Sequence, residues 1–175
     1  AVSVQLSFAA HGSQQDADVG EPVVLAAGAA HVFEMSDKAI DVVSGIRTGG
    51  VYRVKSDLPI IAYQHSPLKN SDSNDSSLLL PIKTLRQDYV VASYPAWVDP
   101  KNVDGYGGRP SYFNIIALEN GTTIEWTPPR DSAGNGVTVP AVAAGMTGST
   151  KLNKLDILQV GASTLTNMDY EIQDI

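Results

Sequence analysis

The stretch Val51–Trp97, VYRVKSDLPIIAYQHSPLKNSDSNDSSLLLPIKTLRQDYVVASYPAW, decides the fold class. It contains four short apolar runs bounded by Pro, Asp, Asn and Ser: VYRV at 51–54, PIIAY at 59–63, SLLLPI at 77–82 and DYVVASY at 88–94. Short runs rich in β-branched and aromatic residues, separated by turn formers, are typical of β-strands. Proline cannot donate a ladder hydrogen bond, so Pro59 and Pro81 are expected at sheet edges or strand starts.

The same pattern continues outside this stretch. Residues 2–9, VSVQLSFA, alternate in polarity and predict a first strand with one apolar face. Residues 22–36 predict two short strands around Gly28; the alternative is a helix, in which Gly28 costs about 1 kcal/mol relative to alanine. The predicted fold is all-β, with antiparallel strands in sandwich-like sheets built from a repeating β unit.

Asn120-Gly121 lies between two apolar alternating runs, and Asn-Gly in this context is a strong hairpin signal. The sequence therefore predicts that Tyr112–Leu118 pairs with Thr122–Thr127 in a hairpin. Long surface loops are expected at 66–77, 98–111 and 128–136, where Gly, Pro, Asp, Asn and Ser gather.

Composition excludes several classes of function. The chain has 175 residues, 43% of them hydrophobic, and 12 Lys plus Arg against 19 Asp plus Glu. The net charge of -7, with no basic stripe, disfavours nucleic acid and anionic lipid as partners. No apolar run approaches the roughly 20 residues of a membrane helix. Cysteine is absent, which excludes disulfides, thiolate nucleophiles and Cys-based zinc sites.

The chain is expected to be a single β-rich module, 1–175, or a fragment of a larger repeated β domain. A weak internal sequence similarity supports the second alternative, because residues 20–56 can be aligned with residues 137–174. The chain begins without Met, and its last residues alternate like a strand that is cut. The natural polypeptide is therefore expected to continue.

Catalytic and metal-binding patterns are weak. The three histidines His11, His31 and His65 never show zinc-ligand spacing. A hydrolase triad of His65-Ser66 with Asp72 or Asp75 lacks a nucleophile elbow, so no catalytic residue is predicted.

A calcium site is the one metal hypothesis that the sequence offers. Asp72, Asn74 and Asp75 gather oxygen atoms of the kind that calcium binds. The same residue types are also ordinary turn formers, because their side chains bond to the local backbone.

The loops Ser66–Ser77 and Asp99–Ser111 are the predicted recognition surface. Aromatic rings with a polar rim provide large contact area at a small entropic cost. Tyr106, between glycines, is the first candidate for a contact residue. The other predicted ligand-binding residues are Trp97, Asn102, Asp104 and Arg109.

Four phrases in order carry a family resemblance: VKSDLPIIAYQHS, DSSLLLPIKTLRQDYVVASYP, SYFNIIALENGTTIEWTP and KLNKLDILQV. They resemble the N-terminal domain family of the IgG Fc-binding proteins, over about Ala26–Ile175. The resemblance implies an extracellular or cell-surface β-rich module of a long secreted bacterial protein; immunoglobulin binding is named from animal members.

The expected function is a non-enzymatic extracellular binding or adhesion module that recognises a protein or glycan at a cell surface. One alternative is a carbohydrate-binding or calcium-dependent module of a secreted enzyme. Another is an architectural subunit that pairs through an open terminal strand.

Overall fold

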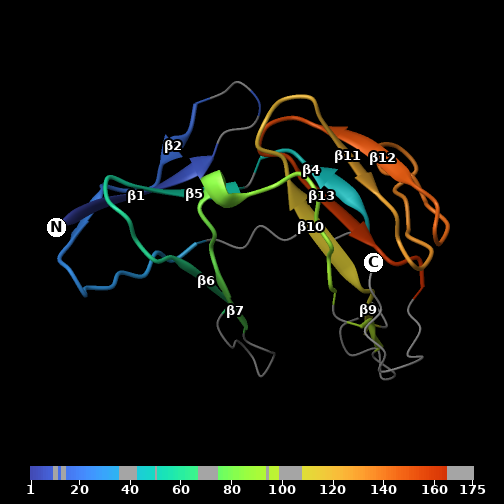
Figure 1. The fold of residues 1–175 in the computed structure, drawn as a ribbon, viewed down its shortest axis with the longest axis horizontal. Helices are drawn as coiled ribbons and strands as arrows, with labels where there is room; N and C mark the ends of the chain where they lie inside the picture. Colours follow the sequence, from blue (N-terminus) through green and yellow to red (C-terminus); the bar gives the residue numbers. More distant parts are fainter. Residues whose placement is uncertain are drawn as a thin grey trace.

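The computed structural model describes residues 1–9, 12, 15–35, 43–49, 51–66, 75–93, 95–98 and 108–164 (Figure 1). These residues form an all-β fold, which confirms the predicted class. The elements are β1 Val2–Ala9, β2 Ala17–Asp18, β3 Val23–Leu25, β4 Gly45–Arg47, β5 Val51–Ser56, β6 Tyr63–Ser66, β7 Asp75–Leu78, the 3-10 turn η1 Ile82–Thr84, β8 Trp97–Val98, β9 Gly108–Arg109, β10 Tyr112–Ile116, β11 Thr122–Trp126, β12 Gly148–Leu152 and β13 Ile157–Gly161.

The N-terminal sheet is built around β1. The strand β5 pairs along one side of β1, from Val4↔Ser56 to Ala9↔Val51, and β3 and β2 pair with its two halves on the other side. Val4 and Leu6 are buried, as the alternation predicts. The rings of Phe8 and Tyr52 meet edge to face, with centroids 5.4 Å apart.

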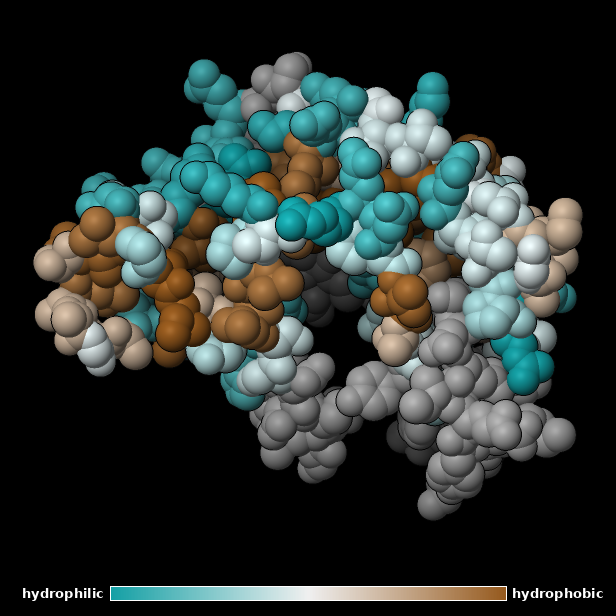
Figure 2. Space-filling model, viewed as in Figure 1, coloured by the Kyte–Doolittle hydropathy of each residue, from teal (hydrophilic) through white to brown (hydrophobic). Residues whose placement is uncertain are grey.

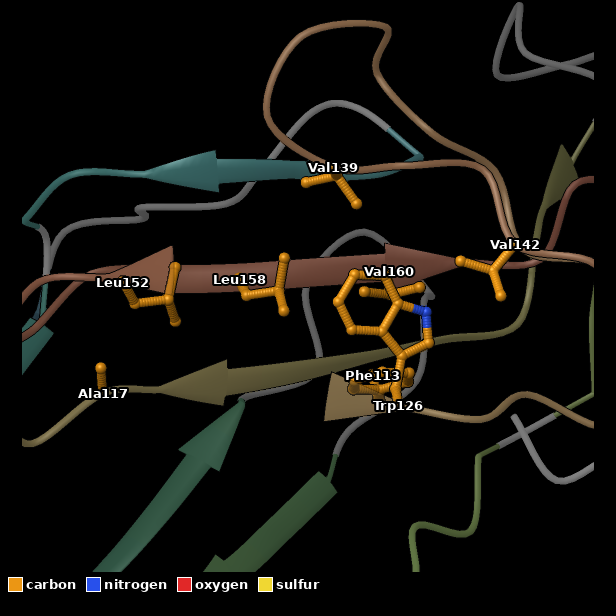
Figure 3. Packing of buried hydrophobic residues seen from close by; sticks show 8 residues of the cluster. All are labelled: Phe113, Ala117, Trp126, Val139, Val142, Leu152, Leu158 and Val160. Atoms are coloured by element: carbon orange, nitrogen blue, oxygen red, sulfur yellow. The ribbon is translucent and has the colours of Figure 1, made fainter. Parts of the chain in front are cut away.

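The second half of the chain, together with β4 from the first half, forms a small two-layer sandwich. One sheet has the order β10-β13-β4, and the other consists of β11 and β12. Their facing sides enclose the largest apolar cluster, whose side chains converge between the strands in Figure 3. Its buried members are Phe113, Ala117, Trp126, Val139, Val142, Leu152, Leu158 and Val160.

The predicted hairpin of Tyr112–Leu118 with Thr122–Thr127 is wrong in its pairing, although both segments are strands. β10 pairs with β13 and β11 pairs with β12, so the turn at Asn120-Gly121 carries the chain from one sheet to the other. The connection between β12 and β13 crosses back beside it, and the Leu155 N–H donates to the Ala117 carbonyl at 2.7 Å. This arrangement buries one apolar face from each of the four strands.

The central stretch Val51–Trp97 forms its strands at other positions than the sequence predicts. β5, β6 and β7 are present, but residues 59–62 and 88–93 form no strand. Pro81 caps η1 instead of starting a strand. The segment 88–93 runs beside β10, where the Ser93 hydroxyl donates to the Tyr112 carbonyl and Val91 packs against the core. A side chain can thus be packed without its backbone joining a ladder.

Around Gly28 the structure contains β3 and a turn, but neither a second strand nor a helix in the described residues up to 35. Gly28 has a φ of 79°, and the Ala29 N–H donates to the Ala26 carbonyl. No helix in the described part of the chain has the length and hydropathy to cross a bilayer.

Candidate binding surface

A two-residue ladder closes the predicted ligand-binding loop. β8 pairs with β9 through Trp97↔Arg109 and Val98↔Gly108. Two of the five predicted ligand-binding residues therefore lie opposite each other at the base of the loop. Tyr106, Asn102 and Asp104 fall between the two strands in sequence and lie outside the described residues.

The polar loop at 66–77 is also closed by a ladder. β6 pairs with β7 through four residue pairs, from Tyr63↔Leu78 to Ser66↔Asp75. Asp75 is thus the first residue of β7, whereas Asp72 and Asn74 lie outside the described residues. Among the residues that are described, no group of three His, Cys, Asp or Glu side chains could hold a metal ion. The calcium site stays a prediction.

His65 contacts a different serine from the one considered in the sequence. Its Nδ1 lies 2.6 Å from Ser76 Oγ across the β6–β7 ladder, and both side chains are exposed. Ser66 pairs instead with Asp75. Within the described ranges no carboxylate bonds to the imidazole, so the third member of a triad is missing there.

A depression next to the sandwich is a feature that the sequence did not reveal. It has a volume of about 690 Å³ and lies between the segment 82–88 and the turn that follows β10. Its apolar lining comes from Ile82, Leu85 and Leu118, and its charged lining from Arg86, Asp88 and Glu119. Within the described residues, no salt bridge involves Arg86, Asp88 or Glu119.

The β6–β7 hairpin presents exposed apolar residues that were predicted to lie in strands. Tyr63 is 65% exposed and Leu78 53% exposed. Figure 2 shows further apolar surface gathered at the end of the molecule where β1 begins, while polar residues cover the upper edge. The sequence shows Tyr63 and Leu78 at the ends of continuous apolar runs, which do not tell whether a second layer covers them.

The family model of IgGFc binding protein matches residues 75–169, more than half of the chain. The chain belongs to the IgGFc binding protein family. The match begins with β7 and includes the depression, the β8–β9 ladder and every sandwich strand except β4. It is narrower than the resemblance over Ala26–Ile175, because residues 26–74 and 170–175 lie outside it. No curated protein and no solved structure matches the chain.

Proposed function

We propose that this chain is a non-enzymatic binding or adhesion module of a larger secreted or cell-surface protein of bacterial origin. The observation that carries the proposal is the match to the IgGFc binding protein family over the sandwich. That family consists of binding modules, generally extracellular, and it implies a protein as the partner. The role in adhesion, the bacterial origin and the location at the cell surface are parts of the proposal that family membership does not itself imply.

There are two candidate contact surfaces: the depression, beside the end of β10, and the loop that β8 and β9 close, next to the start of β10. Specific protein interfaces have an apolar centre and a polar rim, and the depression has both kinds of lining. Leu118 supplies apolar contact, and Arg86, Asp88 and Glu119 supply charge of both signs. Tyr106 would contribute an aromatic contact from the loop, since flat rings dominate binding energy at such surfaces.

The first experiment measures binding of the fluorescently labelled chain to cultured animal cells and, in a separate arm, to immobilised IgG Fc. We expect saturable binding that protease treatment of the cells abolishes and glycosidase treatment leaves intact. Tyr106→Ala and Leu118→Asp should each weaken binding at least tenfold. Thr123→Ala, on the exposed side of β11, is the matched control and should bind like the unchanged chain.

Binding that survives protease but is lost after glycosidase treatment would favour the carbohydrate-binding alternative. Binding to neither cells nor Fc would count against the proposal. The hypothesis that the chain is non-enzymatic would be overturned if the purified chain converted a substrate and a single Asp or His substitution abolished that turnover.

A further inference from the structure

One face of the β6–β7 hairpin is apolar over its length. The Leu79 N–H donates to the Ala62 carbonyl at 2.9 Å, so the register Tyr63↔Leu78 continues beyond the ladder. Opposed residues in an antiparallel pair project to the same side, and successive pairs alternate. The pair Tyr63 and Leu78 therefore shares its face with the pair Ile61 and Leu80.

The alternation of hydrogen-bonded and non-hydrogen-bonded pairs along the ladder supports this assignment of residues to one face. Since Ala62 and Leu79 are hydrogen bonded, Tyr63↔Leu78 and His65↔Ser76 are the non-hydrogen-bonded pairs, in which opposed side chains lie closer. The 2.6 Å contact of His65 Nδ1 with Ser76 Oγ agrees with that geometry. The face consists of four apolar residues followed by this polar pair near the tip.

No other strand in the described ranges pairs with either edge of the hairpin. An isolated two-stranded hairpin is marginally stable in water and needs packing against another element. The face is nevertheless open: the exposed fractions are 75% for Ile61, 65% for Tyr63, 53% for Leu78 and 61% for Leu80. A patch of this kind marks an interaction site more often than bare surface.

We propose that a second copy of this chain covers the face, with the two hairpins packed face to face about a two-fold axis. The four exposed fractions add to about two and a half whole side chains. At roughly 200 Å² for each large side chain, this gives on the order of 500 Å² per copy. The pair would bury about 1,000 Å², which is near the lower limit for a biological interface and typical of a weak, concentration-dependent dimer.

The chemistry of the face is complementary to itself. Its six residues, Ile61, Tyr63, His65, Ser76, Leu78 and Leu80, include no Asp, Glu, Lys or Arg. Two copies can therefore approach without juxtaposing like charges, although each chain carries a net charge of -7. An isologous interface uses the same patch on both subunits, so no second surface is required. This assembly is independent of the partner binding proposed above.

Sedimentation velocity over a range of concentrations tests the proposal on the whole chain. The mass should rise from 18.5 kDa towards twice that value as concentration increases. Leu78→Lys should weaken association at least tenfold, whereas Leu78→Met should preserve it. Gln64→Lys, on the opposite face of the hairpin, and Val90→Lys, 98% exposed outside it, should leave association unchanged. Circular dichroism verifies that each variant keeps its strand content.

A cross-linking experiment tests the geometry without relying on a disruptive substitution. The chain has no cysteine, so Leu78→Cys and Gln64→Cys each introduce a single thiol. A short bifunctional maleimide should join two copies through position 78 but not through position 64. A chain that stays monomeric at every concentration overturns the proposal, as does a dimer that Leu78→Lys leaves intact or that cross-links equally from position 64.

Discussion

Replacing Gly148 with alanine should destabilise the sandwich, although the general rule for strands predicts the opposite. Gly148 is opposite Trp126 in the β11–β12 ladder and is buried. A Cβ at this position would lie 2.4 Å from Val142 Cγ2 and 2.8 Å from Trp126 Cζ2. Both distances are far below van der Waals contact, so a side chain has to move.

The expected magnitude follows from two opposing terms. Alanine reduces the entropy of the unfolded chain and would alone stabilise by about 0.4–1 kcal/mol. Overpacking a close-packed core costs about 1–3 kcal/mol, and here the clash involves a buried indole. We therefore expect a net loss of about 1–2 kcal/mol in unfolding free energy. For a chain of this size the melting temperature should fall by roughly 2–8 °C.

Thermal unfolding followed by circular dichroism, and urea unfolding followed by tryptophan fluorescence, measure this loss. The matched control is Ser149→Ala, the exposed neighbour on β12, which should change stability by less than about 0.5 kcal/mol. The Val142→Ala background should relieve the closest clash, so that Gly148→Ala costs less there than in the unchanged chain. If Gly148→Ala raises the melting temperature, the proposed packing of Trp126 on the glycine is refuted.

Three further predictions test the core, one loop and the metal hypothesis. Leu158→Ala, at a fully buried position of the central strand β13, should lower the free energy of unfolding in urea by about 3–4 kcal/mol. Ile116→Ala, on the exposed side of β10, should lower it by about 1 kcal/mol or less. Equal losses would contradict the sandwich. Asn135→Ala should cost about 1–3 kcal/mol because Asn135 Oδ1 accepts the N–H groups of Val137, Thr138 and Val139 at 2.8–3.0 Å, and Asn135→Asp, which keeps the acceptor, should lose less by the same measurement. EDTA should leave the melting temperature unchanged unless the loop before β7 holds calcium. A metal that binds only the native state stabilises it by RT ln(1 + [L]/Kd), so a fall that calcium reverses would support the calcium site.

The sequence predicted only part of the candidate contact surfaces. Composition identified the loop from 98 to 111, since Gly, Pro, Asp and Asn mark a turn wherever they gather. The two-residue ladder that places Trp97 opposite Arg109 involves strands too short to leave a periodic signal. The depression joins Leu85 to Leu118 across more than thirty residues, and no local pattern indicates such a contact.

The exposure of the apolar face of the β6–β7 hairpin could not be predicted from the sequence either. The runs around Ile61 and Leu78 are apolar, and both were predicted to be strands. Whether a layer covers that face depends on elements distant in the chain, and in the described structure Tyr63 and Leu78 remain exposed.

The sequence by itself determined the class of structure and the location of many strands. Alternation with period two predicted β1 and placed Val2, Val4, Leu6 and Phe8 on one face, of which Val4 and Leu6 are buried. The run before Asn120 and the run after it are the strands β10 and β11. These features are local, because the side chains that encode them are neighbours in the chain.

Tertiary structure alone decided which strands pair. Asn120-Gly121 fixes where the chain reverses, since Gly121 with a φ of 71° allows the turn, but it does not fix whether the two strands share a sheet. β12 and β13 decide that question by pairing with β11 and β10, so that Trp126 and Phe113 lie in the two layers of one core. Burial of apolar surface between the two layers is non-directional, and it brings together residues that are distant in the sequence. No short stretch of sequence could therefore encode which strands pair.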